Sequence, residues 1–272
     1  WLWQIGAYAH IDKIHRRTPF DIIHHATFGR YWVPSWLSLL DTAFVFGPVG
    51  GGEDTPRGLR GGGSLAGRVV DAFRSMARRL AELDPVLRYS LRRSRAIAVA
   101  ATEETAHKLR SLGVARCEIV PQCALDNNQI ATFDALPRPK RDRFRVISIG
   151  RLVPWKGYHL GICAFAAIAD RFPDAEYWIV NDGPEMERLK NLSNELGVSE
   201  RIRFLGKLPS LADVYAALGE SDVLLHPALH EAFGNVCLEA MAAGRPVVCL
   251  QGGGPGLQVT DSSGVAVPAT SE

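Results

Sequence analysis

Two glutamates, Glu231 and Glu239, surround a short glycine-containing turn in the stretch HEAFGNVCLEAMAAGRPVV (230–248). The pattern predicts a loop at Glu231 and a helix that carries Glu239 and stops at Gly244. The Glu239 side chain leans back toward the helix start, where the first amides have no partners inside the helix. Such amides attract an anion, whereas carboxylates repel phosphate and accept hydrogen bonds from hydroxyls. The corner therefore predicts a ligand that offers both groups, such as a sugar nucleotide.

A second group of candidates is the loop GRLVPWKG (150–157), which contains Arg151 and Lys156 between an expected strand and an expected helix. Ligands of doubly wound sheets bind at the carboxyl ends of strands, so both cations are expected beside a diphosphate. Ribose and hexose hydroxyls would then donate to Glu239 and Glu231. The competing interpretation is that these are solvated surface charges. For Glu239 it is weakened, because the neighbours in VCLEAMAA are apolar or small and an unpaired charge there is costly.

The composition suits a globular protein with two α/β domains, since 272 residues with 47% hydrophobic and 22% charged side chains can bury two cores. The net charge of only +2 argues against a nucleic-acid partner. The five cysteines lack C-x-x-C spacing and lie mostly in apolar runs, which favours reduced, buried thiols in a cytosolic protein. The chain starts at Trp1 and stops just after an expected strand, so we expect a fragment truncated at both ends.

The N-terminal half has a less regular pattern than the C-terminal half. In it we expect helices at 1–17 and 102–113, strands at 20–25, 43–49, 96–100 and 117–122, and a basic helical stretch over 69–95. The glycine-rich stretch 47–67 is expected to be a flexible loop, although glycines after a strand also let a ligand approach the backbone.

The C-terminal half alternates short apolar strands with amphipathic helices, which predicts a parallel sheet covered on both faces. We expect strands at 144–150, 176–180, 202–206, 222–227, 246–250 and 264–268, with helices beginning near 158, 184, 211 and 235. The proline-containing, basic segment between the halves predicts a linker. The expected division is a first domain at 1–124, a linker at 125–143 and a second domain at 144–272.

Several of these motifs together carry a family resemblance. GRLVPWKG, NDGPE, FLGKLP, DVLLHPALHEAFGNVCLEAMAAGRPVV and GGPGLQV resemble the nucleotide-sugar-binding half of a retaining GT-B glycosyltransferase of family 4, within the glycosyl transferases group 1. The two glutamates separated by seven residues are the most specific feature. The similarity runs from about 144 to the end, and FDIIHHATF and FVFGPVGGGE extend it more loosely over the first half. It implies a GT-B fold with two Rossmann-like domains facing a cleft, and a subgroup that carries a GPVGGGE loop. The N-terminal domain at 1–124 would be a partial acceptor-side domain, and the domain at 144–272 would bind the nucleotide sugar and lack its end.

The resemblance also implies roles for single residues. Glu231, Lys156 and Arg151 are the implied catalytic residues, with the two cations on the donor diphosphate and Glu231 on the transferred sugar, while Glu239 binds the ribose. The implied donor-binding residues are Gly150, Arg151, Lys156, Asp182, Gly183, Leu208, Glu231, Phe233, Gly234, Asn235, Val236 and Glu239. Asn181 stands where the family usually has glycine, but contacts there are partly made by the backbone.

The first half departs further from the family. Many members have an H-x-H strand end whose second histidine lies near the reacting sugar, but Ala26 occupies that position here, after His24 and His25. His25 could reach the cleft, although a histidine at a strand end is more often satisfied or solvated. The expected acceptor-side cleft residues are His25, Gly50, Gly51 and Gly52. Glu53 is expected to line the cleft without acting as a base.

The implied reaction moves a sugar from a nucleotide-sugar donor to the hydroxyl of a glycan or lipid-linked acceptor, in cell-surface polysaccharide or glycolipid synthesis, with retained anomeric configuration. Cations and amides would stabilise the departing diphosphate. The sequence has no Asp-x-Asp clamp, so no metal or other cofactor is expected. Two alternatives stay open: a GT-B sugar-nucleotide epimerase, which needs acid and base carboxylates that we cannot place, and a truncated nucleotide-sugar-binding protein without activity.

Two basic segments bear on the location of the protein, which we expect to be cytoplasmic. LRYSLRRSR (87–95) and RPKRDRFR (138–145) would permit peripheral contact with an anionic inner membrane leaflet, where lipid-linked acceptors are found. Solvated basic faces are the commoner explanation of such segments.

Overall fold

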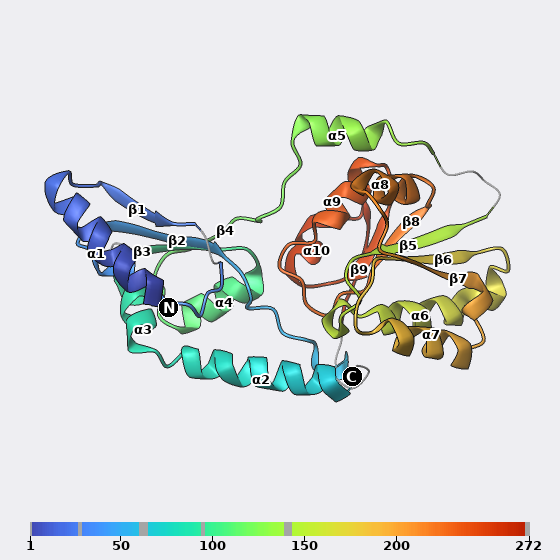
Figure 1. Cartoon of the computed structure of the whole chain (residues 1–272), viewed down its shortest axis with the longest axis horizontal. Helices are drawn as coiled ribbons and strands as arrows, with labels where there is room; N and C mark the ends of the chain where they lie inside the picture. The colour runs from blue at the N-terminus through green and yellow to red at the C-terminus, as the bar shows by residue number, and fades with distance from the viewer. Residues whose placement is uncertain (1, 27–28, 60–64, 94–95, 139–142, 270–272) are drawn as a thin grey trace. The chain divides into compact units, whose positions relative to one another are not determined.

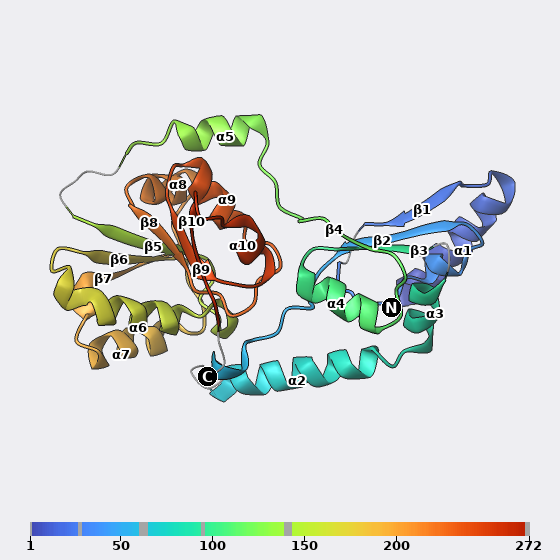
Figure 2. The same cartoon turned by 180° about the vertical axis from the view of Figure 1, so that it is seen from behind.

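The computed structural model describes residues 2–26, 29–59, 65–93, 96–138 and 143–269 (Figure 1). The chain forms two compact units, of which the first is Trp1–Glu53 with Val70–Gln122 and the second is Asp54–Val69 with Cys123–Glu272. Each unit contains one parallel β-sheet with helices packed on it (Figure 2). The predicted α/β fold with parallel sheets is therefore confirmed.

The first unit is built on a four-stranded parallel sheet in the order β1-β2-β3-β4. Its strands are β1 (Ile22–His25), β2 (Ala43–Val49), β3 (Ala96–Ala100) and β4 (Cys117–Ile119), and its helices are α1 (Leu2–Arg17), α3 (Pro85–Arg92) and α4 (Glu103–Ser111), with α2 (Leu65–Ala81) crossing the division between the units. Alternate side chains of β1 and β3 are buried. Ile23 of β1 and the buried alanines of β3 share one hydrophobic core with residues of α1, α3 and α4.

The basic stretch 69–95 is two helices and not the single helical stretch that its pattern predicts. The first helix ends at Ala81, and Asp84 caps the second, because its carboxylate accepts hydrogen bonds from the amides of Val86 at 2.7 Å and Leu87 at 3.3 Å. Pro85 takes the first position of α3, where its missing N–H costs nothing. The pair Asp84 and Pro85 indicates the start of a new helix, but the continuous helical periodicity of the stretch obscures this signal.

The first part of the glycine-rich stretch is fixed by side-chain hydrogen bonds, so the expectation of a flexible loop is wrong there. The amide of Gly51 donates to Glu53 Oε2 at 2.9 Å, and the amide of Gly52 donates to Thr105 Oγ1 at 3.0 Å. The buried Glu53 carboxylate also accepts hydrogen bonds from the hydroxyls of Thr102 at 2.6 Å and Thr105 at 3.0 Å. Glu53 therefore anchors the loop to the start of α4. Part of the later glycine-rich stretch lies outside the described residues.

The second unit is built on a six-stranded parallel sheet in the order β10-β9-β8-β5-β6-β7. Its strands are β5 (Arg145–Ile149), β6 (Glu176–Val180), β7 (Ile202–Gly206), β8 (Val223–His226), β9 (Val247–Leu250) and β10 (Gly264–Val267). Numbered within the unit and taken from the β7 edge, this is the order 3-2-1-4-5-6 of a dinucleotide-binding fold. The strand order reverses between β5 and β8.

Helices cover both faces of this sheet, as the alternating pattern predicts (Figure 1). They are α5 (Asn127–Asp134), α6 (Tyr158–Ile168), α7 (Met186–Glu195), α8 (Leu211–Gly219), α9 (Asn235–Ala242) and α10 (Gly253–Gln258). Successive residues of β5 point to opposite faces: Val146 joins the core under α6 and α7, and Ile147 joins the core under α8 and α9. None of the helices within the described residues is long and apolar enough to cross a membrane.

The segment 125–143, in which the sequence predicts a linker, contains helix α5. Asp126 and Gln129 form a capping box, with the Gln129 amide 2.8 Å from Asp126 Oδ1 and the Asp126 amide 2.9 Å from Gln129 Oε1. Phe133 of this helix is 1% exposed and meets the ring of Tyr215 edge-on, with centroids 4.6 Å apart. This part of the connection is thus packed into the second unit.

All five cysteines are free, but only two of them are buried. Cys237 and Cys249 lie in the core of the second unit, whereas Cys163 is exposed and Cys117 and Cys123 are half-buried. The prediction of buried thiols is therefore wrong for Cys163, an exposed residue of the helix 158–168.

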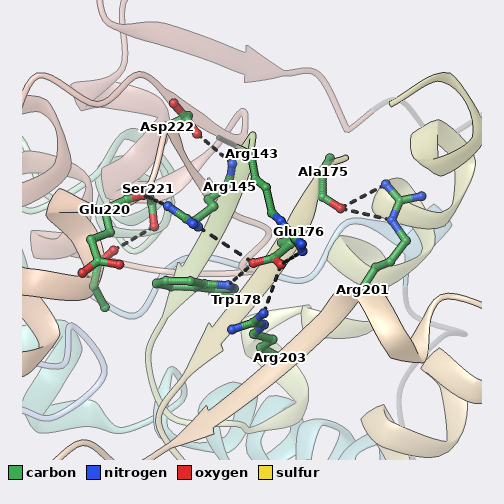
Figure 3. A network of polar contacts seen from close by, with 11 residues as sticks. Arg143, Arg145, Ala175, Glu176, Trp178, Arg201, Arg203, Glu220, Ser221 and Asp222 are labelled. Atoms are coloured by element: carbon green, nitrogen blue, oxygen red, sulfur yellow. Dashed lines mark hydrogen bonds and ion pairs between the residues drawn. The ribbon is translucent and has the colours of Figure 1, made fainter. Parts of the chain in front are cut away.

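A buried carboxylate, Glu176, ties together the amino-terminal ends of β5, β6 and β7 (Figure 3). It accepts hydrogen bonds from Arg143, from Trp178 Nε1 at 3.1 Å and from Arg203 at 3.1 Å. Arg145 Nε lies 3.8 Å from the same carboxylate, and its guanidinium packs 5.1 Å from the centroid of the Trp178 ring. Burial alone would raise the pKa of Glu176, but these donors and positive charges bring it below its ordinary value.

We expect Glu176→Gln to destabilise the second unit by about 2 to 4 kcal/mol, because it leaves several arginines without their buried anion. A lowered pKa in the folded state means that the stabilisation is present above the ordinary glutamate pKa and is lost as the pH falls through the folded value. The wild type should therefore lose stability below about pH 4.5, and the variant should lose less there. Thermal unfolding between pH 3 and 7 measures both, with the exposed Glu187→Gln as a control that changes stability by under about 0.5 kcal/mol.

Candidate functional site

The candidate site residues of the second unit lie beyond the carboxyl ends of its strands. In a sheet of this order the connections from β5 and β8 run to opposite faces, and ligands of such sheets bind beside this reversal of the strand order. The loop after β5 carries Arg151 and Lys156, and the loop after β8 carries Glu231. The fold thus brings two motifs that are far apart in sequence to one place in the sheet, as predicted.

The two loops are packed against each other through their backbones. The loop after β5 makes a short turn, Pro154–Lys156, and then Gly157 adopts a left-handed conformation with φ of 66°. A Cβ atom on Gly157 would lie 1.9 Å from the carbonyl oxygen of Pro227. The amide of Leu229 donates to the carbonyl of Trp155 at 2.9 Å. Only glycine allows this approach, which sets the position of Lys156 relative to the second loop.

Lys156 and Glu231 form an ion pair across the two loops. Their side chains are 22% and 16% exposed, so the pair is largely shielded but accessible to a ligand. Burial by itself would raise the pKa of Glu231, but the charge and hydrogen bond of Lys156, with smaller contributions from His226 and the Phe233 amide, lower it below the ordinary value. Glu231 is therefore ionised at neutral pH, and Lys156 neutralises it.

Glu239 is a half-buried carboxylate on α9, one turn into the helix. Within the described part of the chain it has no hydrogen-bond or ion-pair partner, and burial raises its pKa above the ordinary value. Its charge acts on the neighbouring Tyr215 hydroxyl, whose pKa it raises in addition to the effect of burial. An unpaired, partly desolvated carboxylate is well suited to accept hydrogen bonds from ligand hydroxyls.

The start of α9 offers free backbone donors, as predicted. Gly234 has a left-handed φ of 72°, and across the described residues the amides of Gly234, Asn235 and Val236 have no acceptor. The preceding residue, Phe233, is 40% exposed. An anion placed at this helix start would meet both the amides and the helix dipole.

Glycines at the start of α10 pack closely against the backbone of the Glu231 loop. The Gly254 amide donates to the Glu231 carbonyl at 2.8 Å. A Cβ atom would lie 2.1 Å from that carbonyl oxygen at Gly253 and 2.4 Å from the Phe233 carbonyl oxygen at Gly254. The GGPGLQV motif is therefore explained as a close backbone contact that supports Glu231.

Just after β5, Gly150 is held by a hydrogen bond, whereas the Arg151 side chain has no bonding partner among the described residues. Gly150 has a φ of 146°, and its carbonyl accepts a hydrogen bond from the Tyr158 hydroxyl at 2.6 Å. The Arg151 side chain is exposed and makes no hydrogen bond or ion pair with any residue that the structure describes. It is thus available to an anionic ligand.

Asp182 and Gly183, after β6, lie beside the β5 loop. The Leu152 amide donates to the Asp182 carbonyl at 2.9 Å, and a Cβ atom on Gly183 would lie 2.3 Å from the Leu152 carbonyl oxygen. Asn181 has a φ of 97°, a region that favours glycine, and its side-chain oxygen accepts the Asp182 amide at 2.8 Å. The departure from glycine at Asn181 is thus compatible with the backbone that the position requires.

The remaining predicted residues lie partly in the second unit and partly in the first. Leu208, two residues after β7, packs against the core under α8 and α9. His25 is buried in the first unit, where its Nδ1 lies 2.8 Å from Ser35 Oγ, in keeping with the interpretation of a satisfied histidine. Gly50, Gly51 and Gly52 also belong to the first unit.

Three residues near Glu231 were not predicted from the sequence to belong to the site. The Cys123 thiol donates to the Phe233 carbonyl at 3.0 Å, and Gln258 Nε2 lies 2.8 Å from the same sulfur. His226, the last residue of β8, has its Nε2 atom 4.0 Å from Glu231 Oε2. Of these, only His226 had a usable signal, since it ends a strand at the reversal of the sheet. The described residues contain no group of three or more His, Cys, Asp or Glu side chains placed to hold a metal ion.

Comparison with known proteins shows that the chain is similar to glycosyltransferases. The chain is 33% identical over 175 residues to the lipopolysaccharide core biosynthesis glycosyltransferase LpsD of Rhizobium meliloti, covering 61% of this chain and 46% of that protein. It is 28% identical over 295 residues to the 2-deoxystreptamine glucosyltransferase of Streptomyces kanamyceticus, covering 98% of this chain and 68% of that protein. The chain thus spans about half to two thirds of the length of these two relatives.

The fold and the family are shown by two further matches. The structure of Anabaena HepE in complex with UDP and glucose superposes with a TM-score of 0.59 at 20% identity, covering 96% of this chain and 67% of that one, which supports the GT-B class of α/β fold. Residues 131–272, which include both glutamates and the cationic loop, match the family described as glycosyl transferases group 1. The chain therefore belongs to the glycosyl transferases group 1 family.

Proposed function

We propose that this chain is a family 4 enzyme that binds a nucleotide sugar and transfers the sugar, with retained anomeric configuration, to an acceptor hydroxyl. The observation that carries the proposal is the Lys156–Glu231 ion pair at the reversal of the sheet, together with a Glu239 carboxylate and amides at the start of α9 that have no partner among the described residues. A sugar diphosphate offers an anion and hydroxyls to these groups at once.

In the proposed complex the diphosphate draws the Lys156 ammonium away from Glu231. Arg151, which has no partner among the described residues, supplies a further positive charge. Further N–H donors come from the amides of Gly234, Asn235 and Val236. These groups stabilise the negative charge that grows on the diphosphate as the glycosidic bond breaks. The backbones that carry these groups are closely packed at Gly157, Gly253 and Gly254, so the reorganisation required is confined to the Lys156 and Arg151 side chains.

The two carboxylates have separate tasks in this proposal. Glu239 accepts hydrogen bonds from the ribose, and Glu231 accepts them from the transferred sugar once Lys156 has moved. No protein nucleophile is assigned, because the leaving oxygen and the incoming hydroxyl can meet on one face of the sugar. The cations and amides do the work of a metal clamp, so we propose that no metal or other cofactor takes part and expect EDTA to leave the transfer rate unchanged.

The acceptor proposed is a glycan or a lipid-linked sugar of cell-surface polysaccharide or glycolipid synthesis. The named role of LpsD in lipopolysaccharide core biosynthesis supports this choice. Five free cysteines support a cytoplasmic location.

Peripheral contact with an anionic membrane is a further part of the proposal. The described arginines of the two basic segments also serve the fold, since Arg93 donates to the Leu40 carbonyl at 2.8 Å and Arg143 pairs with Glu176. A membrane would meet only their exposed sides. Co-sedimentation with anionic vesicles at low salt should show binding that salt removes, and its absence would contradict the contact.

Product analysis tests the reaction itself. The chain is incubated with UDP-, GDP- and ADP-sugars, with and without lipid-linked and oligosaccharide acceptors, and the anomeric configuration of any product is read by NMR. We expect an acceptor-dependent product with the configuration of the donor. An epimerised sugar nucleotide formed without acceptor, or an inverted product, would contradict the proposal. Bound but unchanged donor with every acceptor would indicate a binding protein.

A further inference from the structure

His226 is a buried histidine whose Nε2 atom has no hydrogen-bond partner among the described residues. The residue ends β8 and is 4% exposed. Within the described part of the chain, its Nε2 atom makes no hydrogen bond, and it points at the ion pair of the site, 4.0 Å from Glu231 Oε2. Leaving a buried nitrogen unpaired is costly, so the arrangement calls for a second state in which this nitrogen is used.

The charged groups that face His226 come from two loops. Lys156 lies on the loop after β5, and Glu231 on the loop after β8. Burial and the Lys156 charge together lower the pKa of His226 to about 4, although Glu231 opposes them. While Lys156 holds Glu231, the ring is therefore neutral at physiological pH and has no reason to approach the carboxylate.

Withdrawal of Lys156 changes this balance. Glu231 would then be a shielded carboxylate without its cation, which is unfavourable. The nearest described group able to replace that cation is His226, because a small movement brings Nε2 from 4.0 Å to hydrogen-bond distance. The same withdrawal removes the positive charge that opposes protonation of the ring.

We propose that His226 is a positioning residue that replaces Lys156 as the partner of Glu231 when a ligand phosphate takes Lys156, and that its ring gains a proton in doing so. The proton comes from the buffer and forms the Nε2–H bond that donates to Glu231. The proposal rests on the proposed function, since it deepens the role of the same site. Its consequence is that Glu231 stays ionised and in place beneath the sugar after its lysine has left.

The first test needs no ligand. In Lys156→Met the cation is absent from the start, so the pKa of His226 should rise by about 1 to 3 pH units. NMR titration of histidine ring resonances measures this shift, with the His226 signal assigned by its loss in His226→Gln. Lys190→Met, which removes a lysine from an exposed pair, is the matched control and should leave the His226 pKa unchanged. An unchanged His226 pKa in Lys156→Met would overturn the proposal.

The second test uses UDP, GDP and ADP on the unmodified chain. The nucleotide that binds should raise the pKa of His226 as Lys156→Met does. Calorimetry at pH 7 in two buffers of different ionisation enthalpy should then show proton uptake by the wild type and none by His226→Gln, which keeps an N–H donor but cannot titrate. Binding without uptake, or with the same uptake in His226→Gln, would overturn the inference and leave the donor site standing. Failure of all three nucleotides to bind would instead contradict the proposed function. The ligand-free titration would still decide whether the Lys156 charge controls the pKa of His226.

Discussion

Replacing Lys156 with methionine is expected to reduce the rate of glycosyl transfer about 100- to 1000-fold, the loss seen when one group that stabilises a developing anion is removed. Methionine keeps an unbranched, slightly shorter side chain and removes its charge. The diphosphate loses its shielded cation, and Glu231 is left without its ion-pair partner in the empty site. Steady-state rates at saturating donor measure the effect.

Lys190→Met is the matched control for that loss, because Lys190 is 47% exposed and pairs with the exposed Glu187. Its rate should stay within about twofold of the wild type, since exposed pairs contribute little. A Lys156→Met variant that is folded, binds donor normally and turns over at the wild-type rate would remove Lys156 from the mechanism.

Gly157→Ala is expected to destabilise the second unit by about 2 to 5 kcal/mol and to weaken nucleotide binding at the same time. Two effects add: a left-handed backbone is strained for alanine, and the new Cβ atom would lie 1.9 Å from the Pro227 carbonyl oxygen. Relief of that contact must push the β5 loop away from the β8 loop, which separates Lys156 from Glu231. Thermal unfolding and nucleotide titration measure the two consequences.

Gly197→Ala separates strain from contact. Gly197 has a similar φ of 70°, but a Cβ atom there would have nothing within 4 Å. We expect a loss of only about 1 to 2 kcal/mol and unchanged nucleotide binding. Equal behaviour of the two alanine variants would show that the contact between the loops is not what positions Lys156.

The sequence predicted those parts of the fold that depend on local pattern. Alternating strands and helices gave the parallel sheet, and the Thr102 cap and the glycine stop of α9 were visible as single residues. The helix α5 was missed because prolines and charges dominate its surroundings, although the Asp126 and Gln129 capping box was a sufficient signal. The break between α2 and α3 was missed for a similar reason, because the helical period continues across Pro85.

The site was predictable where spacing is itself the signal, and less so where contacts join distant segments. The interval between Glu231 and Glu239 predicted one carboxylate in a loop and the other on a helix, and the structure has both in these places. That Lys156 and Glu231 form an ion pair across 75 residues depends on the strand order, which reverses between their two strands. The contact of Cys123 with the Phe233 loop spans 110 residues and follows from no local pattern. The unused nitrogen of His226 could be recognised only in three dimensions.

The most direct test of the central claim is calorimetric titration of the chain with UDP, GDP, ADP and their common sugar conjugates, alongside Lys156→Met and Glu239→Ala. The account predicts selective binding of one nucleotide, weakened at least about tenfold by each substitution because each removes a charged contact. Binding that neither substitution affects would place the ligand elsewhere. Absence of binding by the folded wild type would contradict a nucleotide-sugar site at the reversal of the sheet.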